Sequence, residues 1–232
     1  MSNFQLTRDQ VINGALRICG VVDPEETATA NQLSTAAEAL NTMTAAWENE
    51  GLPLWKTQEH IIQPIGGQTT YSITTDRPLE VTNVVLRNNT SATSPIDITM
   101  VRLSREEYWL LGNKEATGYP TQWYYEYGSS SGTMYLYPTP SPNVAPMLQL
   151  ILYYQAPFTS TSAGTDIPDF PSEFMQALKW GLAQQIMHEY NVPLQKMQMI
   201  EKRAEKEKDD AFGFNVEHTS VYFNWSKYGG YQ

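Results

Sequence analysis

The segment that decides the fold is residues 39–55, Ala39-Leu-Asn-Thr-Met-Thr-Ala-Ala-Trp-Glu-Asn-Glu-Gly-Leu-Pro-Leu-Trp55. Its first half continues an apolar stripe with steps of three and four residues, the spacing of one helix face. Gly51 and Pro53 then end the helix. From about Lys56 the apolar residues recur at every second position, as in a strand. The helical stripe comprises Leu33, Ala37, Leu40, Met43 and Trp47.

A first helix precedes this stripe. Thr7 and Gln10 have the spacing of a capping box, and Gly20 supplies a C-terminal stop. The second helix is expected to begin near residues 27–29. The apolar positions of the first helix are Val11, Ile12, Ala15, Leu16 and Cys19.

The middle of the chain, about residues 56–156, has the period of β-strands. Thr69, Tyr71 and Ile73 alternate, as do Trp123, Tyr125 and Tyr127. Clusters of Gly, Pro, Ser and Asn separate these runs, as turns between antiparallel strands require. One short helix is expected here, capped by Ser104 and Glu107 and stopped by Gly112. Further strands are expected at residues 80–87, 96–102 and 148–154.

Two more helices follow the β-rich region. Pro171 suits the first turn of the third, and the fourth begins near Pro193. The apolar positions of the fourth helix are Leu194, Met197, Ile200 and Ala204. Residues 201–210 continue with alternating charges, so we expect the end of this helix to project beyond its own core.

The last twenty residues are rich in aromatic side chains and glycine. So many exposed rings would favour aggregation, so we expect the tail to bury them against a neighbouring subunit or a partner. Packing on its own subunit is the alternative. The expected binding residues are Phe212, Phe214, Val221, Tyr222, Phe223, Trp225, Tyr228 and Tyr231.

These patterns predict an α+β protein: an antiparallel four-helix bundle with an inserted antiparallel β-sandwich or barrel and an extended C-terminal tail. The expected divisions are 1–55 and 159–212 for the two halves of the bundle, 56–158 for the β-rich domain and 213–232 for the tail. The expected helical core comprises Leu16, Leu40, Trp47, Trp55, Phe174, Leu178, Leu182 and Ile186.

Composition restricts the function. The chain has 232 residues, 41% of them apolar, and a formal net charge of −10. An acidic globular chain lacks the basic face that general nucleic-acid binding requires. Its single cysteine, Cys19, excludes an internal disulfide and a multi-cysteine zinc site. We see no signal peptide and no apolar run of membrane-spanning length, so we expect folding in a cytoplasm.

The motifs that could carry chemistry have simpler explanations. Gly128-Ser-Ser-Ser-Gly132 fits a nucleophile pattern, but strand-like residues flank it on both sides, which favours a hairpin loop. His60, His188 and His218 lie in distant segments and lack zinc-site spacing. Asp166, Asp169 and Glu173 suit the start of a helix better than a catalytic carboxylate pair. We therefore expect no catalytic residues, cofactor or metal.

Three segments, RDQVINGALRICGV, ALNTMTAAWENEGLPLW and DIPDFPSEFMQALKWGLAQQIMHEYNV, resemble the podophage head-to-tail adaptor family, also called tail accessory factors or packaged-DNA stabilisation proteins. The resemblance implies a virion-neck protein that is assembled in the host cytoplasm. It implies a ring of about twelve copies below the portal. It also implies a C-terminal tail that grips the portal, an opposite end that meets the tail nozzle or needle, and a lumen through which packaged DNA passes without tight binding.

Two other functions stay open at this point. A virion-associated cell-wall hydrolase would need two convergent carboxylates in a cleft. A carbohydrate- or receptor-binding tail module could stack sugars on Trp123, Tyr125 and Tyr127 if these rings faced solvent. Alternating rings in strands more often face the core.

Overall fold

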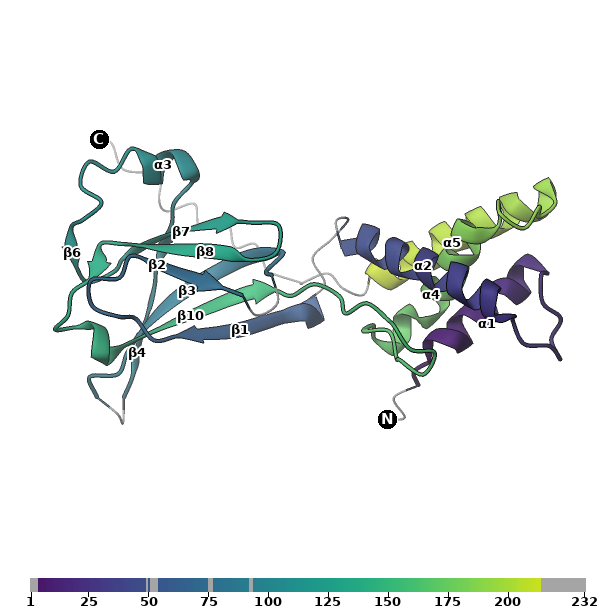
Figure 1. The fold of residues 1–232 in the computed structure, drawn as a ribbon, viewed down its shortest axis with the longest axis horizontal. Helices are drawn as coiled ribbons and strands as arrows, with labels where there is room; N and C mark the ends of the chain where they lie inside the picture. Colours follow the sequence, from purple (N-terminus) through teal and green to yellow (C-terminus); the bar gives the residue numbers. More distant parts are fainter. Residues whose placement is uncertain (1–3, 49, 51–53, 75–76, 92–93, 214–232) are drawn as a thin grey trace, which may run out of the picture. The chain divides into compact units, whose positions relative to one another are not determined.

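A computed structural model describes residues 4–48, 50, 54–74, 77–91 and 94–213. The chain combines α-helices with antiparallel sheets and divides into two compact units. One unit contains residues up to Met43 together with those from Thr161 onward, and the other is formed by Thr44–Ser160. Figure 1 shows α1, α2, α4 and α5 gathered in one part of the chain and the strands with α3 in the other. The first division lies inside a helix, where composition gives no signal of a boundary.

The helices are α1 (Arg8–Cys19), α2 (Ala30–Glu48), α4 (Met175–Ile186) and α5 (Leu194–Gly213), with a 3-10 turn at Ser172–Phe174 before α4. The capping box that begins α1 is confirmed, since the Gln10 N–H donates to Thr7 and the Thr7 N–H donates to the Gln10 side chain. Gly20 ends α1 with φ 76°, in the left-handed region that favours glycine. Thr29 and Gln32 exchange the same two hydrogen bonds at the start of α2.

The loop before α4 holds the start of α1. The Arg8 N–H donates to the Asp166 carbonyl at 2.7 Å, and the Asp9 N–H donates to the Gly164 carbonyl at 3.2 Å. These N–H groups have no partner within the helix itself, because the first turn of any helix leaves its donors free. The loop therefore replaces the missing carbonyls and joins two segments that are about 150 residues apart in sequence.

Helix α4 packs against both α1 and α5. Its close approach to α1 occurs at Gly14, where the aliphatic part of Lys179 occupies the space a side chain would fill. The buried positions of α5 are Ile200, Ala204 and Ala211. Leu194, expected on the same stripe, is 70% exposed, so that prediction is wrong. It is the first residue of the helix and lies before its buried face begins.

The other unit contains two four-stranded sheets and a short two-stranded pairing. The first sheet has the order β1-β10-β3-β4 and the second β2-β8-β7-β5. The bounds are β1 (Thr57–Ile62), β2 (Thr70–Ile73), β3 (Glu80–Asn88), β4 (Ile96–Thr99), β5 (Val101–Arg102), β6 (Thr117–Gly118), β7 (Gln122–Tyr127), β8 (Gly132–Tyr137), β9 (Thr139–Pro140) and β10 (Leu148–Gln155). The short helix α3 (Arg105–Trp109) has its expected capping box at Ser104 and Glu107. Two 3-10 turns, Leu54–Lys56 and Ala145–Met147, complete the unit.

The two larger sheets share one apolar core. Every second residue of β10, from Leu148 to Tyr154, enters this core, and Met134 and Leu136 of β8 enter it from the other sheet. Trp123 and Tyr125 of β7 also lie in it, whereas Tyr127 is 38% exposed. The period of two seen in the sequence therefore follows from one buried face per strand.

Two short pairings depart from the expected antiparallel order. Strand β5 runs parallel to β7, and β6 runs parallel to β9. The first arises because the strand from β4 to β5 changes sheets: the Met100 N–H donates to Val84 of β3, and the Val101 N–H donates to Thr121 beside β7. The chain then passes through α3 before it returns along β7, and such a crossover makes parallel neighbours possible.

A second, smaller cluster covers the opposite face of β7. Tyr124 stacks with Tyr108 of α3 at a centroid distance of 5.3 Å and with Tyr135 of β8 at 5.5 Å. Leu103 completes the buried part of this cluster. Strand β7 is thus buried on both faces around Tyr124, which an alternating pattern does not predict.

Candidate functional site

The last turn of α5 returns to its own core. Ala211 is buried, and the Phe212 ring meets the Phe174 ring edge-on, with centroids 5.4 Å apart and planes at 78°. Ile200, Ala204 and Ala211 are separated by four and seven residues, so one side of the helix stays on its core to the end. The expectation that the charged end of this helix projects beyond its core is therefore wrong.

Phe212 is the one expected binding residue that the structure describes. It is partly buried, and its ring contact lies within the chain. The other expected binding residues lie outside the described residues: Phe214, Val221, Tyr222, Phe223, Trp225, Tyr228 and Tyr231.

The expected helical-core residues are buried with one exception. Trp55 belongs to the 3-10 turn before β1 and is half-buried, and its ring lies 6.3 Å from that of Phe158. Trp47 also falls within the Thr44–Ser160 unit but is buried on α2, whereas Trp55 lies beyond α2 and is only half-buried, so the prediction for Trp55 is wrong. Its cause is that α2 ends at Glu48 and the chain has already entered the β-rich unit. The buried residues are Leu16, Leu40, Trp47, Phe174, Leu178, Leu182 and Ile186.

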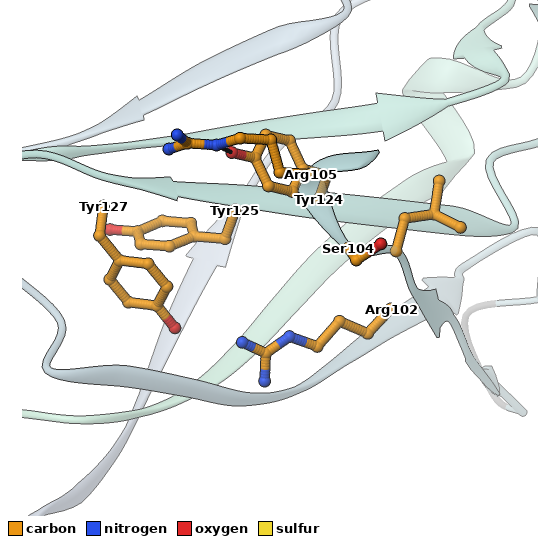
Figure 2. Close-up of a pocket in the computed structure, with 7 residues that line it drawn as sticks. Arg102, Ser104, Arg105, Tyr124, Tyr125 and Tyr127 are labelled. Carbon is orange, nitrogen blue, oxygen red and sulfur yellow. Dashed lines mark hydrogen bonds between the residues drawn. The ribbon is translucent and has the colours of Figure 1, made fainter. Parts of the chain in front are cut away.

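A hollow of about 450 Å³ opens on the β-rich unit where β5 leads into α3. Figure 2 shows the rings of Tyr125 and Tyr127 between the side chains of Arg102 and Arg105. Leu103, Ser104 and Tyr124 complete the lining. The sequence does not indicate that these two arginines share a hollow, because they come together only where β5 leads into α3 beside β7.

Each arginine of the hollow already has partners. Arg102 lies 3.4 Å from Glu80 and over the Trp123 ring. Arg105 donates to the Tyr124 hydroxyl at 2.9 Å and lies 3.4 Å from Glu126. The hydrogen bond to Tyr124 raises the pKa of Arg105. Since both cations are balanced by carboxylates on the same surface, the hollow is a poor site for a phosphate or another free anion.

Tyr125 also lines the hollow, and its hydroxyl lies beside Gly132. It is buried and has no hydrogen-bond partner within the described chain. Burial raises the pKa of Tyr125 to about 12, so the hydroxyl stays protonated at neutral pH. A side chain at Gly132 would collide with this hydroxyl. The open part of the aromatic lining is therefore the Tyr127 ring, which is 38% exposed, whereas Tyr124 and Tyr125 are buried.

The other motifs have structural roles. Residues 128–131 form the turn between β7 and β8, where the Gly128 N–H donates to the Ser131 carbonyl, so the hairpin prediction is confirmed. Asp166 accepts hydrogen bonds from the N–H groups of Ala163 and Ser162, and these lower its pKa. Asp166 thus orders the loop that caps α1. It does not lie at the start of the following helix, which is the position that the sequence had indicated.

Within the described ranges, no group of three or more His, Cys, Asp or Glu residues is arranged to hold a metal ion. No helix among those same residues is both long and apolar enough to cross a bilayer.

The family model for the SU10 adaptor protein matches residues 7–215, which is well over half of the chain. The chain belongs to the SU10 adaptor protein family. The resemblance to an adaptor family seen in the sequence is thereby confirmed. The match begins just before α1, includes the β-rich unit and continues past the end of α5. No curated protein matches this chain.

Among solved structures, the adaptor is similar to a chain described as the "Neck of empty GTA particle computed with C6 symmetry". The two are 11% identical, and the likeness covers 88% of this chain and 95% of the other, with a TM-score of 0.29.

Proposed function

We propose that this protein is a structural head-to-tail adaptor of a bacteriophage virion, located in the neck and without catalytic activity. The observation that carries the proposal is the adaptor family match, which runs through both units and ends only beyond α5. An adaptor needs rigid folded units and surfaces for neighbours, and it needs no reactive centre. The chain is therefore expected to act by joining the portal to the tail.

The copies form a ring of about twelve below the portal, with cyclic symmetry matched to it. The ring completes the head and retains packaged DNA, while its lumen leaves a path for ejection. The formal charge of −10 per copy supports this role, since an acidic lumen repels the phosphate backbone. The pairing of Arg102 and Arg105 with Glu80 and Glu126 supports it as well.

The C-terminal aromatic segment is the portal anchor in this proposal. Its starting point is held by the contact between Phe212 and Phe174. Rings that are buried on a partner contribute on the order of 2 kcal/mol each, so several together can offset the entropy of ordering the segment. The opposite end of the ring meets the tail nozzle or other tail proteins.

The finer architecture follows the same proposal. The helices α1, α2, α4 and α5 act as a four-helix bundle that forms the body of the ring. The two larger sheets act as a β-sandwich inserted into that bundle. Their shared core of side chains from β3, β7, β8 and β10 supports the sandwich.

The alternatives have less support. Trp123 and Tyr125 are buried, so of the three rings only Tyr127, which is 38% exposed, is open to stack on a sugar. Asp166 is engaged by two backbone N–H groups, which leaves it poorly suited to a carboxylate pair for glycoside cleavage.

The test is to image the neck of particles made with the full chain and with a chain that ends after Gly213. The full chain should form a ring between portal and tail. The shortened chain should be folded but absent from the particles, and heads made with it should package DNA and then leak it. Lys227→Ala is the matched control, because it changes the same segment without removing an aromatic ring. It should attach normally.

Two results would contradict the proposal in different ways. If the full chain does not lie between portal and tail, the adaptor role is wrong. If the shortened chain attaches as well as the full chain, the adaptor role stands but the C-terminal segment is not the anchor.

A further inference from the structure

The sheet β1-β10-β3-β4 has an open edge on each side. Within the described residues, β1 is paired only with β10 and β4 only with β3. Both edges expose apolar side chains: Ile61 of β1 is 56% exposed, and Ile96 and Ile98 of β4 are 62% and 40% exposed. An edge strand with unpaired peptide groups and apolar side chains is a template for another strand.

The directions of the unpaired peptide groups follow from the pairing. The Met100 N–H donates to the Val84 carbonyl at 3.0 Å, so the alternation of an antiparallel pair turns Ile98 and Ile96 toward β3 as well. The peptide groups of Asp97 and Thr99 therefore point away from the sheet.

The same reasoning applies to β1. The Ala156 N–H donates to the Lys56 carbonyl at 3.0 Å, so residues 58, 60 and 62 face β10. The peptide groups of Thr57, Glu59 and Ile61 consequently point outward. Each edge thus offers alternate donors and acceptors for which the described residues provide no backbone partner.

We propose that β4 of one copy pairs with β1 of the next, so that this sheet continues from copy to copy. The inference rests on the proposed function, because it concerns neighbours in a ring of adaptors. Successive strands of the sheet are antiparallel, so β1 and β4 run in opposite directions and meet as an antiparallel pair. The contact joins two different edges, and such heterologous contacts can close into a ring.

The faces of the two edges also match. Ile62 packs against the shared core, and Ile98 lies opposite Leu86, which is fully buried in it. The outward peptide groups on both edges belong to residues whose side chains lie on the other face. Pairing them keeps core-facing side chains on one face throughout, as a continuous sheet requires.

One register fits best. Placing Glu59 opposite Thr99 sets Ile61 opposite Asp97, and it uses all four residues of β4. It also brings Ile96 of one copy opposite Ile62 of the next, which extends the core across the contact. A shift of two residues one way would place Glu59 opposite Asp97, a repulsive pair of like charges. A shift the other way would leave half of β4 beyond the end of β1.

The test is disulfide trapping between two single-cysteine-added variants of the full chain, Glu59→Cys and Thr99→Cys, mixed in equal amounts under oxidising conditions. Directly paired residues have Cα atoms about 5.5 Å apart, which suits a disulfide. Cys19 is 5% exposed and stays out of the reaction. The heterodimer should exceed the two homodimers together by about tenfold. The matched control pairs Glu59→Cys with Glu115→Cys, which is exposed but on a loop, and it should give a statistical mixture.

A second experiment tests whether blocking the β4 edge weakens self-association. Thr99→Pro removes the outward-pointing N–H of Thr99. Sedimentation at rising concentration should show weaker self-association for Thr99→Pro than for the unchanged chain. The ladder within the copy should survive, because the Thr99 N–H points outward. If Thr99→Pro melts early, Ile96→Lys replaces it, since that side chain is exposed in the single copy.

A statistical mixture from the edge pair, or self-association that neither substitution weakens, would overturn the inference. Neither result would bear on the proposed attachment to the portal, because the experiment contains no portal. Failure of the edge pairing and failure of the adaptor role are thus distinguished.

Discussion

The Phe174 ring, next to the start of α4, and the Phe212 ring, in the last turn of α5, meet edge-on at a centroid distance of 5.4 Å. Edge-to-face ring pairs contribute about 0.5–1.5 kcal/mol beyond the area they bury. This contact fastens the end of α5 to the helical unit. The stable part of the chain is therefore expected to extend through Phe212.

The first prediction concerns this boundary. A chain that ends after Gly213 should melt at the same temperature as the full chain, because the Phe174–Phe212 contact is retained. A chain that ends after Asp210 should melt at a lower temperature, because it also lacks the buried Ala211. Differential scanning calorimetry of the three chains measures both effects. Gly213→Ala is a control, since an added Cβ there meets nothing within 4 Å. Equal melting of both shortened chains would contradict the prediction.

The second prediction concerns the buried faces of the helices. Leu182→Ala should lower the free energy of unfolding by about 2–5 kcal/mol and Trp47→Ala by about 3–5 kcal/mol, because each leaves a cavity in packed surroundings. Urea titration measures the change. Leu194→Ala makes the same chemical change at a residue that is 70% exposed, so it should have little effect. If Leu182→Ala behaves like Leu194→Ala, the α4 face described here is wrong.

The third prediction is a pH dependence that arises from Cys19. Burial raises the pKa of this thiol from 9.0 to about 11, although nearby Lys196 opposes the shift. The unfolded chain therefore loses its proton first as the pH rises. The stabilising contribution is fully present below about pH 9 and is lost as the pH rises through about 11.

The measurement is the urea midpoint between pH 8 and pH 11 for the unchanged chain and for Cys19→Ala. The difference between the two chains should change over this interval, and the unchanged chain should lose more stability. Tyrosines titrate in the same range in both chains and cancel in the difference. Parallel curves for the two chains would contradict the assignment to Cys19.

The fourth prediction concerns DNA. Arg87, Arg102 and Arg105 are paired with Asp97, Glu80 and Glu126. The purified chain should therefore not bind duplex DNA at physiological salt. Replacing the three carboxylates together, by Asp97→Asn, Glu80→Gln and Glu126→Gln, frees three cations and should produce binding that weakens as salt rises. Fluorescence anisotropy with a labelled duplex measures it. Tight binding by the unchanged chain would contradict the prediction.

The sequence by itself determined the local structure. The capping residues Thr7 and Ser104 and the stop at Gly20 lie where the pattern predicted, because a cap depends on residues three or four positions away. The change of period near Lys56 marked the passage from helix to strand for the same reason. The turn at residues 128–131 followed from the strand-like residues on both sides of it.

Only the tertiary structure decided how distant segments meet. The return of Phe212 to Phe174, the double burial of β7 and the placement of Trp55 beside Phe158 all depend on residues brought together by the fold. The balance of Arg102 and Arg105 by Glu80 and Glu126 depends on neighbouring strands. A hydrophobic period says that a face is buried but not which surface buries it, and sequence separation says nothing about distance in space. The open edges β1 and β4 became visible for that reason only once the strand order was known.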